Sequence, residues 1–194
     1  AKKGYIYKGM KPVYWCPSDQ TALAEAEIEY ADDPCTTIFV KFPVRDDQGK
    51  LGRYGDLSKM YFVIWTTTPW TIPGNMAICV NAAFDYVLLQ APNGEIYILA
   101  EGLAESVCKA AGIDFSACTV LAILKGSEFE LMTARHPLFD RDSILLCGDH
   151  VTLEAGTGCV HTAPGFGADD FNICRAYDAA GKTNIGVPVP VNAK

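Results

Sequence analysis

The chain has 194 residues, 49% of them hydrophobic and 20% charged, so it can bury the core of one substantial domain and is short for two. Its net charge of −7 makes it a poor general binder of nucleic acid, because phosphate neutralisation by Lys and Arg dominates that affinity, and any contact with nucleic acid should involve few phosphates. No apolar run reaches the roughly 18 residues of a membrane span, and the N-terminus lacks the apolar core of a secretion signal, so we expect a cytoplasmic protein.

Residues 21–30 are the first stretch with a readable pattern. Their alanines and glutamates favour a helix. However, Glu25, Glu27 and Glu29 alternate with apolar residues, and strict alternation places all three acids on one face of a strand. We therefore expect a strand over 21–30.

Short runs of β-branched and aromatic residues follow along most of the chain. Turn residues separate them, and Pro92-Asn93-Gly94 is typical of a hairpin turn. This rhythm predicts a mainly β fold, a barrel or a sandwich. The predicted strands cover residues 38–42, 60–65, 76–80, 86–89, 96–100, 119–124 and 143–146.

Two segments have the features of helices. Residues 103–111 end before Gly112, a natural C-terminal cap. Residues 169–180 begin with two acids, which suit a helix N-terminus, and stop before Gly181. No repeat or linker interrupts the chain, so we expect one domain over residues 1–194 with a few peripheral helices.

The eight cysteines do not form a metal-binding pattern. No two are spaced as CxxC, and the chain has only three histidines. Most of the cysteines lie in apolar runs, as in Ile78-Cys79-Val80, so we expect reduced, buried thiols and neither a metal nor a cofactor.

The stretch TTTPW, residues 66–70, ends an apolar strand in three hydroxyls. On an extended strand Thr66 and Thr68 share a face while Thr67 points away. Pro69 restricts the preceding residue and removes a backbone donor. Such a segment holds hydroxyls on the rim of a cleft, although threonine is common in strands and proline commonly ends them.

The stretch GTGCVHTAPGFGADDF, residues 156–171, joins glycines, a histidine and two acids. The glycines permit close backbone approach, and the acids open the second predicted helix. The segment matches neither a dinucleotide fingerprint nor a nucleophile elbow. A lone histidine is often structural and an Asp at a helix start is often a cap, so one acid is free for another role.

Three segments together resemble the editing domain of the isoleucyl branch of class I aminoacyl-tRNA synthetases. The valyl and leucyl branches carry an Arg and an acid where Thr68 and Trp70 stand, and residues 161–164, HTAP, have the isoleucyl form. The resemblance spans nearly the whole chain in the expected order. The three segments are KPVYWCPSDQTALAEAEIEY (11–30), WTTTPWTIPGN (65–75) and GTGCVHTAPGFGADDF (156–171).

The resemblance implies a closed β-barrel editing domain excised from a larger synthetase, because the ATP-binding signatures HIGH and KMSKS are absent. Two positions depart from the family pattern. Phe166 stands where a histidine is usual, and Cys159 where an alanine is frequent. Phe166 removes a polar group near the expected pocket, so we assign it no catalytic role.

The roles of the family map onto matching positions. Asp170 would bind the α-ammonium group of the substrate, which leaves Asp169 to cap the helix. His161 would form a pocket wall that refuses isoleucine and would help to orient water. Thr67 and Thr68, with Thr66 beside them, would place hydroxyls around the amino acid and the terminal adenosine. Asn75 would influence editing, and Trp70 would shape the pocket.

The implied function is the hydrolysis of valine from mischarged tRNA(Ile). One methylene in a hydrophobic pocket gives only about 10–200-fold discrimination, so a second site must remove valine. The partners are the acceptor end of tRNA(Ile) carrying valine and the rest of the synthetase, and valyl-adenylate is a second candidate substrate. The alternatives are a tRNA-end binding module without activity, an editing domain of the valyl branch, which would prefer threonine, and a metal-dependent hydrolase.

Overall fold

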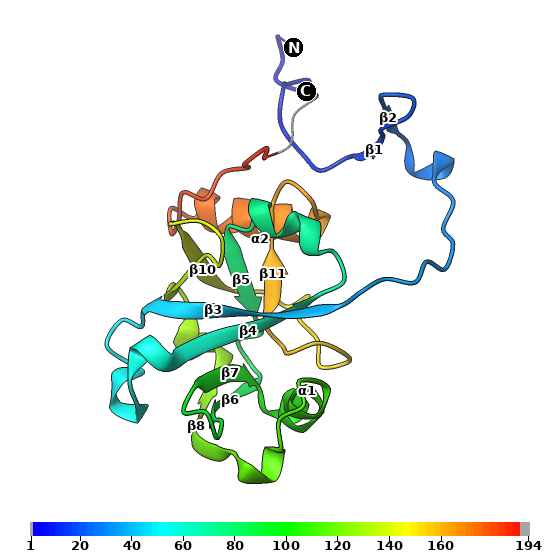
Figure 1. Ribbon diagram of the computed structural model, residues 1–194. Coiled ribbons are helices and arrows are strands. Elements are labelled where there is room, and N and C mark those ends of the chain that lie inside the picture. Colours follow the sequence, from blue (N-terminus) through cyan, green and yellow to red (C-terminus); the bar gives the residue numbers. More distant parts are fainter. Residues whose placement is uncertain (1, 191–194) are drawn as a thin grey trace.

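A nine-stranded sheet forms the body of the chain in the computed structural model, which describes residues 2–190 (Figure 1). The strand order is β11-β5-β10-β9-β3-β4-β7-β6-β8. Neighbours run antiparallel except for the pairs β5–β10 and β4–β7. The strands are β3 (Ile38–Asp46), β4 (Met60–Thr66), β5 (Ala77–Val80), β6 (Asp85–Gln90), β7 (Ile96–Ala100), β8 (Thr119–Lys125), β9 (Thr133–Arg135), β10 (Asp142–Cys147) and β11 (Val160–Thr162).

The seven strands predicted between residues 38 and 146 are all present, as β3 to β8 and β10. The predicted hairpin is confirmed too, because β6 and β7 pair antiparallel across the Pro92-Asn93-Gly94 turn. Gly94 has φ +82°, and its N–H donates to the carbonyl of Ala91 at 2.8 Å. A glycine is suited to this left-handed position. The three-residue strands β9 and β11 were not predicted.

The sheet does not close, so the expected closed barrel is not supported. Within the described residues β11 and β8 form its two edges. The long strand β3 changes partner along its length, pairing with β4 through Pro43 and then with β9 from Val44. A register shift between Val44 and Asp46 accompanies the change. Such an irregularity bends a strand, and here it divides the sheet into two parts whose outer strands do not pair.

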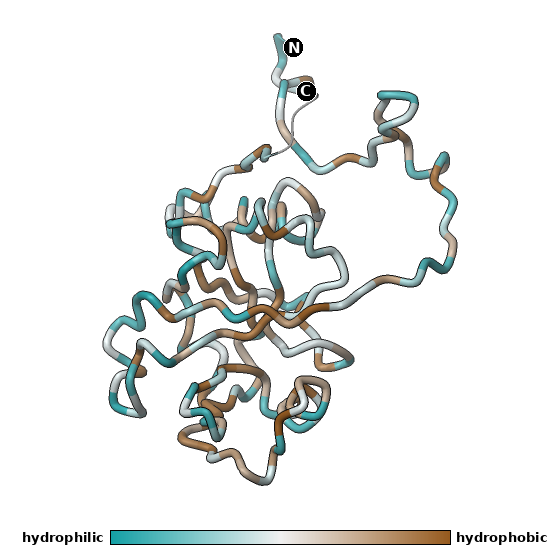
Figure 2. The backbone as a smooth tube through the Cα atoms, in the orientation of Figure 1, coloured by the Kyte–Doolittle hydropathy of each residue, from teal (hydrophilic) through white to brown (hydrophobic). Residues whose placement is uncertain are grey.

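The main hydrophobic core lies among β3, β4, β6 and β7. The rings of Phe62 and Phe129 meet edge to face, with centroids 5.5 Å apart, and Tyr86 meets Phe129 in the same way at 5.6 Å. Such pairs add to the gain from burying apolar area. Figure 2 shows hydrophobic segments where β3 and β4 cross at the centre of the molecule. The packed core therefore holds these strands in fixed positions.

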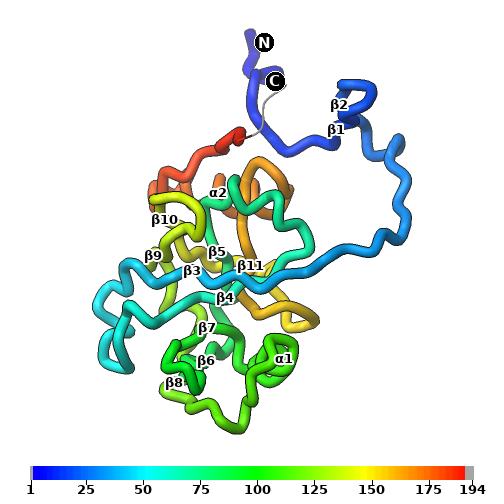
Figure 3. Tube along the Cα trace, in the orientation of Figure 1, coloured from blue at the N-terminus to red at the C-terminus, as the bar shows by residue number. Residues whose placement is uncertain are grey.

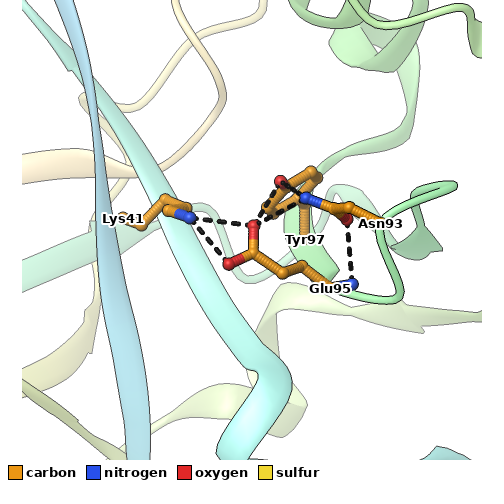
Figure 4. A network of polar contacts seen from close by, with 4 residues as sticks. All are labelled: Lys41, Asn93, Glu95 and Tyr97. Carbon is orange, nitrogen blue, oxygen red and sulfur yellow. Dashed lines mark hydrogen bonds and ion pairs between the residues drawn. The ribbon is translucent and has the colours of Figure 1, made fainter.

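A polar cluster on the sheet surface joins β3 to the β6–β7 hairpin (Figure 4). Lys41 on β3 lies 2.8 Å from both carboxylate oxygens of Glu95. The hydroxyl of Tyr97 donates to Glu95 at 2.6 Å, and Asn93 donates to the same carboxylate at 3.1 Å. The ion pair spans 54 residues of sequence, so it ties the hairpin to β3 across β4.

The N-terminal arm, residues 2–36, runs outside the body before it enters β3 (Figure 3). It holds a small hairpin of β1 (Tyr14–Cys16) and β2 (Thr21–Leu23). The predicted strand over 21–30 is wrong beyond Leu23, because a 3-10 turn, η1 (Glu25–Glu27), follows. Glu27 turns its carboxylate back to accept the N–H of Ala24 at 2.7 Å, which ends the alternation. The arm exposes large apolar side chains at Tyr5, Ile6, Tyr7, Met10, Val13, Tyr14, Trp15 and Tyr30.

Both predicted helices are present, as α1 (Ala104–Ala110) and α2 (Ala168–Ala179). Gly112 and Gly181 follow them with φ +69° and +70°, as expected of glycines at helix C-termini. Of the helices in residues 2–190, none is both long and apolar enough to cross a membrane.

Candidate functional site

A cavity of about 400 Å³ brings together the two stretches that the sequence singled out. The first stretch contributes the end of β4 and the turn that follows it. The second contributes β11, the segment before it and the start of α2. The lining includes Thr66, Thr67, Thr68, Thr71, His161 and Asp170. Residues about 90 positions apart therefore share one concave site lined by both polar and apolar side chains.

The threonine loop leaves β4 and enters a 3-10 helix, η4 (Pro69–Gly74). Pro69 occupies its first position, where a missing N–H costs nothing. Thr66 is buried, and its Oγ1 accepts the N–H of Thr68 at 3.0 Å and lies 3.3 Å from the Thr68 hydroxyl. The Thr71 hydroxyl donates to the carbonyl of Thr68 at 2.8 Å. The loop is thus fixed by its own hydroxyls.

The C-terminal end of η4 is held from outside the cavity. The buried His136 donates from Nε2 to the carbonyl of Ile72 at 2.8 Å, and Arg141 donates to the next carbonyl, that of Pro73. His136 Nδ1 accepts the N–H of Leu138 at 3.0 Å, which places the ring proton on Nε2. Two side chains of the β9–β10 connection therefore fix the turn that carries the threonines.

His161 on β11 is hydrogen-bonded through both ring nitrogens. Asn75 donates to Nδ1 at 2.7 Å, and Thr71 Oγ1 lies 2.9 Å from Nε2. Because Ser143 donates to Asn75 Oδ1, the Asn75 amide nitrogen must face Nδ1. His161 consequently carries its proton on Nε2 and donates it to Thr71, whose own proton goes to Thr68. We call this hydrogen-bonded set, Thr66, Thr68, Thr71, Asn75 and His161, the threonine network.

Burial, with a smaller contribution from the neighbouring His136, lowers the pKa of His161 to about 4. The ring is therefore neutral at neutral pH. Since Nδ1 accepts from Asn75 and the Nε2 proton is donated to Thr71, His161 has no free lone pair with which to take a proton. Its geometry is that of a rigid wall and not of a general base.

The Gly156-Thr157-Gly158 segment owes its path to the core. Gly158 has φ +75°, and a Cβ placed there would lie 2.4 Å from the Cβ of Ala100, so a larger residue does not fit. The fully buried Tyr86 donates its hydroxyl to the Gly158 carbonyl at 2.6 Å, and Ala100 donates to the Thr157 carbonyl at 2.8 Å. β6 and β7 thus position the segment that leads into β11.

Asp170 lies in the first turn of α2 and turns back into the cavity wall. Its Oδ2 accepts the N–H of Ala163 at 2.9 Å. Burial raises the pKa of Asp170, while the Ala163 hydrogen bond and the charge of His150 oppose that rise. The expected cap at Asp169 is wrong: Gly167 is the N-cap, no side chain caps the helix there, and Asp169 is exposed. The tight turn before α2 explains this, because a glycine takes the cap position.

Two of the predicted substrate-binding residues do not line the cavity. The side chain of Trp70 is 69% exposed on the outside of η4. Asn75 is fully buried behind His161 and acts on the cavity only through that ring. Phe166 does line the cavity, and its ring packs so closely on Gly74 that a Cβ there would lie 2.4 Å from Cε2.

Sequence reasoning missed Thr71 and His150, which also line the cavity. Thr71 lies within the segment WTTTPWTIPGN, five residues after Thr66, and a helical turn after Pro69 would place it facing back towards Thr68. His150 follows a turn, Gly148-Asp149, and no spacing in the sequence distinguishes it. Within residues 2–190 no group of three or more His, Cys, Asp or Glu side chains is placed to hold a metal ion.

Comparisons with known proteins agree with this architecture. The family model described as tRNA synthetases class I (I, L, M and V) matches residues 1–170. An isoleucine–tRNA ligase of Thermoanaerobacter sp. (strain X514) is 57% identical over 178 residues, 91% of this chain and 19% of that protein. That of Caldicellulosiruptor bescii is 54% identical over 196 residues, 100% of this chain and 20% of that protein. The chain thus spans about a fifth of the length of these relatives.

Solved structures show the same fold. The leucyl-tRNA synthetase editing domain of P. knowlesi superposes with a TM-score of 0.64 at 16% identity, over 76% of this chain and 63% of that one. The GlLeuRS-CP1 structure gives 0.62 at 20% identity, over 77% and 63% of the two chains. The chain therefore belongs to the class I tRNA synthetase family, with isoleucine–tRNA ligases among its relatives and the fold of the synthetase editing domain.

Proposed function

We propose that this chain is the editing domain of an isoleucine–tRNA ligase and hydrolyses valyl-tRNA(Ile). One observation carries the proposal: a single cavity gathers a half-buried carboxylate, a set of fixed hydroxyls and a neutral, immobile imidazole. Its volume of about 400 Å³ lies within the range of small-ligand sites. Family membership and the editing-domain fold support the same reading.

Each group has a role in cleaving an aminoacyl ester. Asp170 binds the α-ammonium group of valine by a charge-assisted hydrogen bond, which gains strength in a partly buried site. Thr67 and Thr68 surround the ester and the terminal ribose with hydroxyls. His161 closes the space beside the valine methyl groups. The ester is already activated for attack by water, so no serine or cysteine nucleophile is needed.

The exclusion of isoleucine depends on the rigidity of His161. Both ring nitrogens are fixed, and the ring cannot turn aside without breaking hydrogen bonds to Asn75 and Thr71. Leaving buried partners unsatisfied costs about 1–3 kcal/mol each. A substrate with one more methylene would have to meet this cost, whereas valine does not.

Valyl-adenylate is a weaker candidate substrate than the tRNA ester. Its phosphate would enter a cavity lined by the carboxylates of Asp170 and Glu154, with no Lys or Arg among the described lining residues. The ammonium end fits this charge and the phosphate does not. The ester presents its ammonium group next to a ribose, so the lining favours the reaction after transfer to tRNA.

The partners of the domain follow from the same proposal. The relatives are about five times as long, and the N-terminal arm exposes a row of large apolar side chains. We propose that the remaining synthetase covers this arm and binds most of the tRNA, in the cytoplasm. An arm with this many exposed large apolar side chains is a candidate interaction site.

The test is deacylation by the purified 194-residue chain. We expect release of valine from valyl-tRNA(Ile), little release of isoleucine from isoleucyl-tRNA(Ile), and no effect of EDTA. Binding without release would identify a tRNA-end module. Faster hydrolysis of threonyl-tRNA(Val) would assign the chain to the valyl branch. Loss of activity in EDTA would indicate a metal-dependent hydrolase.

A further inference from the structure

The three histidines of the chain differ in how their rings are held. Both nitrogens of His161 are engaged in the threonine network, and both nitrogens of His136 bond to backbone groups, those of Ile72 and Leu138. His150 lines the cavity, yet neither of its nitrogens has a hydrogen-bond partner among the described residues. Its Nε2 is buried, whereas Nδ1 is not, so Nδ1 is the nitrogen that a water molecule can reach. An unpaired ring nitrogen at the wall of a cavity is able to bind water, so this ring calls for a functional explanation.

The backbone holds His150 firmly at this position. On one side the N–H of Gly148 donates to the carbonyl of Val80 at 2.9 Å, and on the other Asn81 donates to the carbonyl of Val151 at 3.1 Å. A Cβ on Gly148 would lie 2.6 Å from Cε1 of His150 and 2.8 Å from Nδ1. A larger residue at 148 would therefore push the ring away from its present position, so Gly148 allows the imidazole to lie close to the backbone at this wall.

His150 also interacts with the carboxylate that we assign to the substrate ammonium group. Burial raises the pKa of Asp170, and the charge of His150 acts in the opposite direction, so the two groups lie within electrostatic reach of each other. Among the described residues, the one hydrogen bond to that carboxylate goes to Oδ2, from Ala163. The lining at this point therefore contains an imidazole and a carboxylate with hydrogen-bonding capacity left over.

We propose that His150 binds the water molecule that attacks the ester carbonyl. The inference rests on the proposed function. The oxygen of the water forms a bond to the carbonyl carbon, and the bond from that carbon to the ribose oxygen breaks. One proton of the water ends on the ribose oxygen, and the other is released to solvent from the new carboxyl group. His150 performs this role because the ring of His161 has no free nitrogen and the ring of His136 lies outside the cavity.

The experiment compares His150→Leu and His150→Gln in the 194-residue chain, with valyl-tRNA(Ile) as substrate. Leucine keeps bulk without a polar atom, and glutamine keeps a hydrogen-bonding group. We expect His150→Leu to lower kcat about 100-fold, the size of effect expected when a reactant is misplaced, with KM within about twofold. His150→Gln should recover at least about tenfold of that loss. Asp149→Asn, an exposed neighbour on the same turn, should match the unsubstituted chain.

Three results would overturn the inference. They are a kcat above about a third of the original in His150→Leu, a loss confined to KM, and a glutamine variant as slow as the leucine variant. If His150→Leu does not fold, as judged by its thermal transition, His150→Phe replaces it with the same criteria. If the unsubstituted chain does not release valine, the proposed function fails. If it does and the His150 variants remain active, only the inference about His150 fails.

Discussion

The cavity contains two polar regions built in different ways. In the threonine network, hydroxyl, amide and imidazole groups bond to one another, and the donated protons can be followed from His161 through Thr71 to Thr68. The pair of His150 and Asp170 has unused hydrogen-bonding atoms. A network whose hydrogen-bonding groups are all paired is rigid and shapes a site. Groups that still lack partners are where a ligand or a water molecule gains the most from a new hydrogen bond. By this difference, the threonine network excludes substrates that are too large, and His150 and Asp170 bind the substrate and the water.

Of the changes that follow, removing the negative charge of Asp170 should give the largest effect on the rate of hydrolysis. Asp170→Asn should slow valyl-tRNA(Ile) hydrolysis at least about 30-fold, because about 2 kcal/mol of ion-paired contact is lost in the transition state. Deacylation under single-turnover conditions measures it. Asp169→Asn, one residue away and exposed, is the matched control and should keep its activity. A rate above half the original in Asp170→Asn would mean that another group binds the ammonium.

Removing Asn75, the fully buried member of the threonine network, should lower the stability of the fold. Asn75→Ala leaves His161 Nδ1 and Ser143 without their buried partner, which should lower the free energy of unfolding by about 2 kcal/mol. Urea denaturation measures this change. Asn93→Ala removes an exposed amide in a turn and should change stability by less than about 0.5 kcal/mol. Equal effects of the two substitutions would show that the network contributes no more than a surface contact.

Opening the wall of the network should change specificity more than rate. His161→Ala should raise hydrolysis of isoleucyl-tRNA(Ile) about tenfold, since the extra space admits one more methylene. Parallel deacylation assays with the valyl and isoleucyl substrates give the ratio. If the cognate ester remains stable with this variant, the side chain does not supply the steric barrier.

Lowering the pH should reduce the stability that neutral His161 contributes, and this effect should be the smallest. The pKa of His161 is lowered from 6.5 to about 4 in the folded chain, so the unfolded chain binds a proton first as pH falls. The stability contributed by neutral His161 is present above pH 6.5 and is lost progressively towards pH 4. Between pH 7 and pH 5.5 the loss should be about 1 kcal/mol. His161→Gln should remove this part of the pH dependence, and urea curves at both pH values test it.

The sequence predicted the sheet strands well, because seven of them are short runs rich in β-branched and aromatic residues and separated by turn residues. It failed at Glu25 to Glu29, where a single side-chain bond from Glu27 to Ala24 ends the alternation. The closed barrel that the family resemblance implied is not supported, and the strand pattern could not decide between a barrel and a sandwich. The partner change of β3 depends on a local register shift and not on composition.

For the site, the sequence identified two stretches that meet in one cavity. It could not show that Asn75 lies behind His161, or that Trp70 faces outward, because a 3-10 helix sets both directions. His150 was invisible for another reason. Its proposed role rests on ring nitrogens that have no hydrogen-bond partner, and no spacing of residues in the sequence indicates an unpaired nitrogen. A bound valine–adenosine analogue would locate the ammonium group relative to Asp170 and the methyl groups relative to His161.

The charge of the cavity lining has a consequence for how the domain responds to ionic strength. Asp170 and Glu154 line the cavity, with no Lys or Arg in the described lining, so the chain neutralises few phosphates there. Few condensed cations leave the RNA on binding, and KM for the acceptor end should change little as salt rises. Attachment to the nucleic acid would then be supplied by other parts of a synthetase, and the domain would act on whichever end is delivered to it.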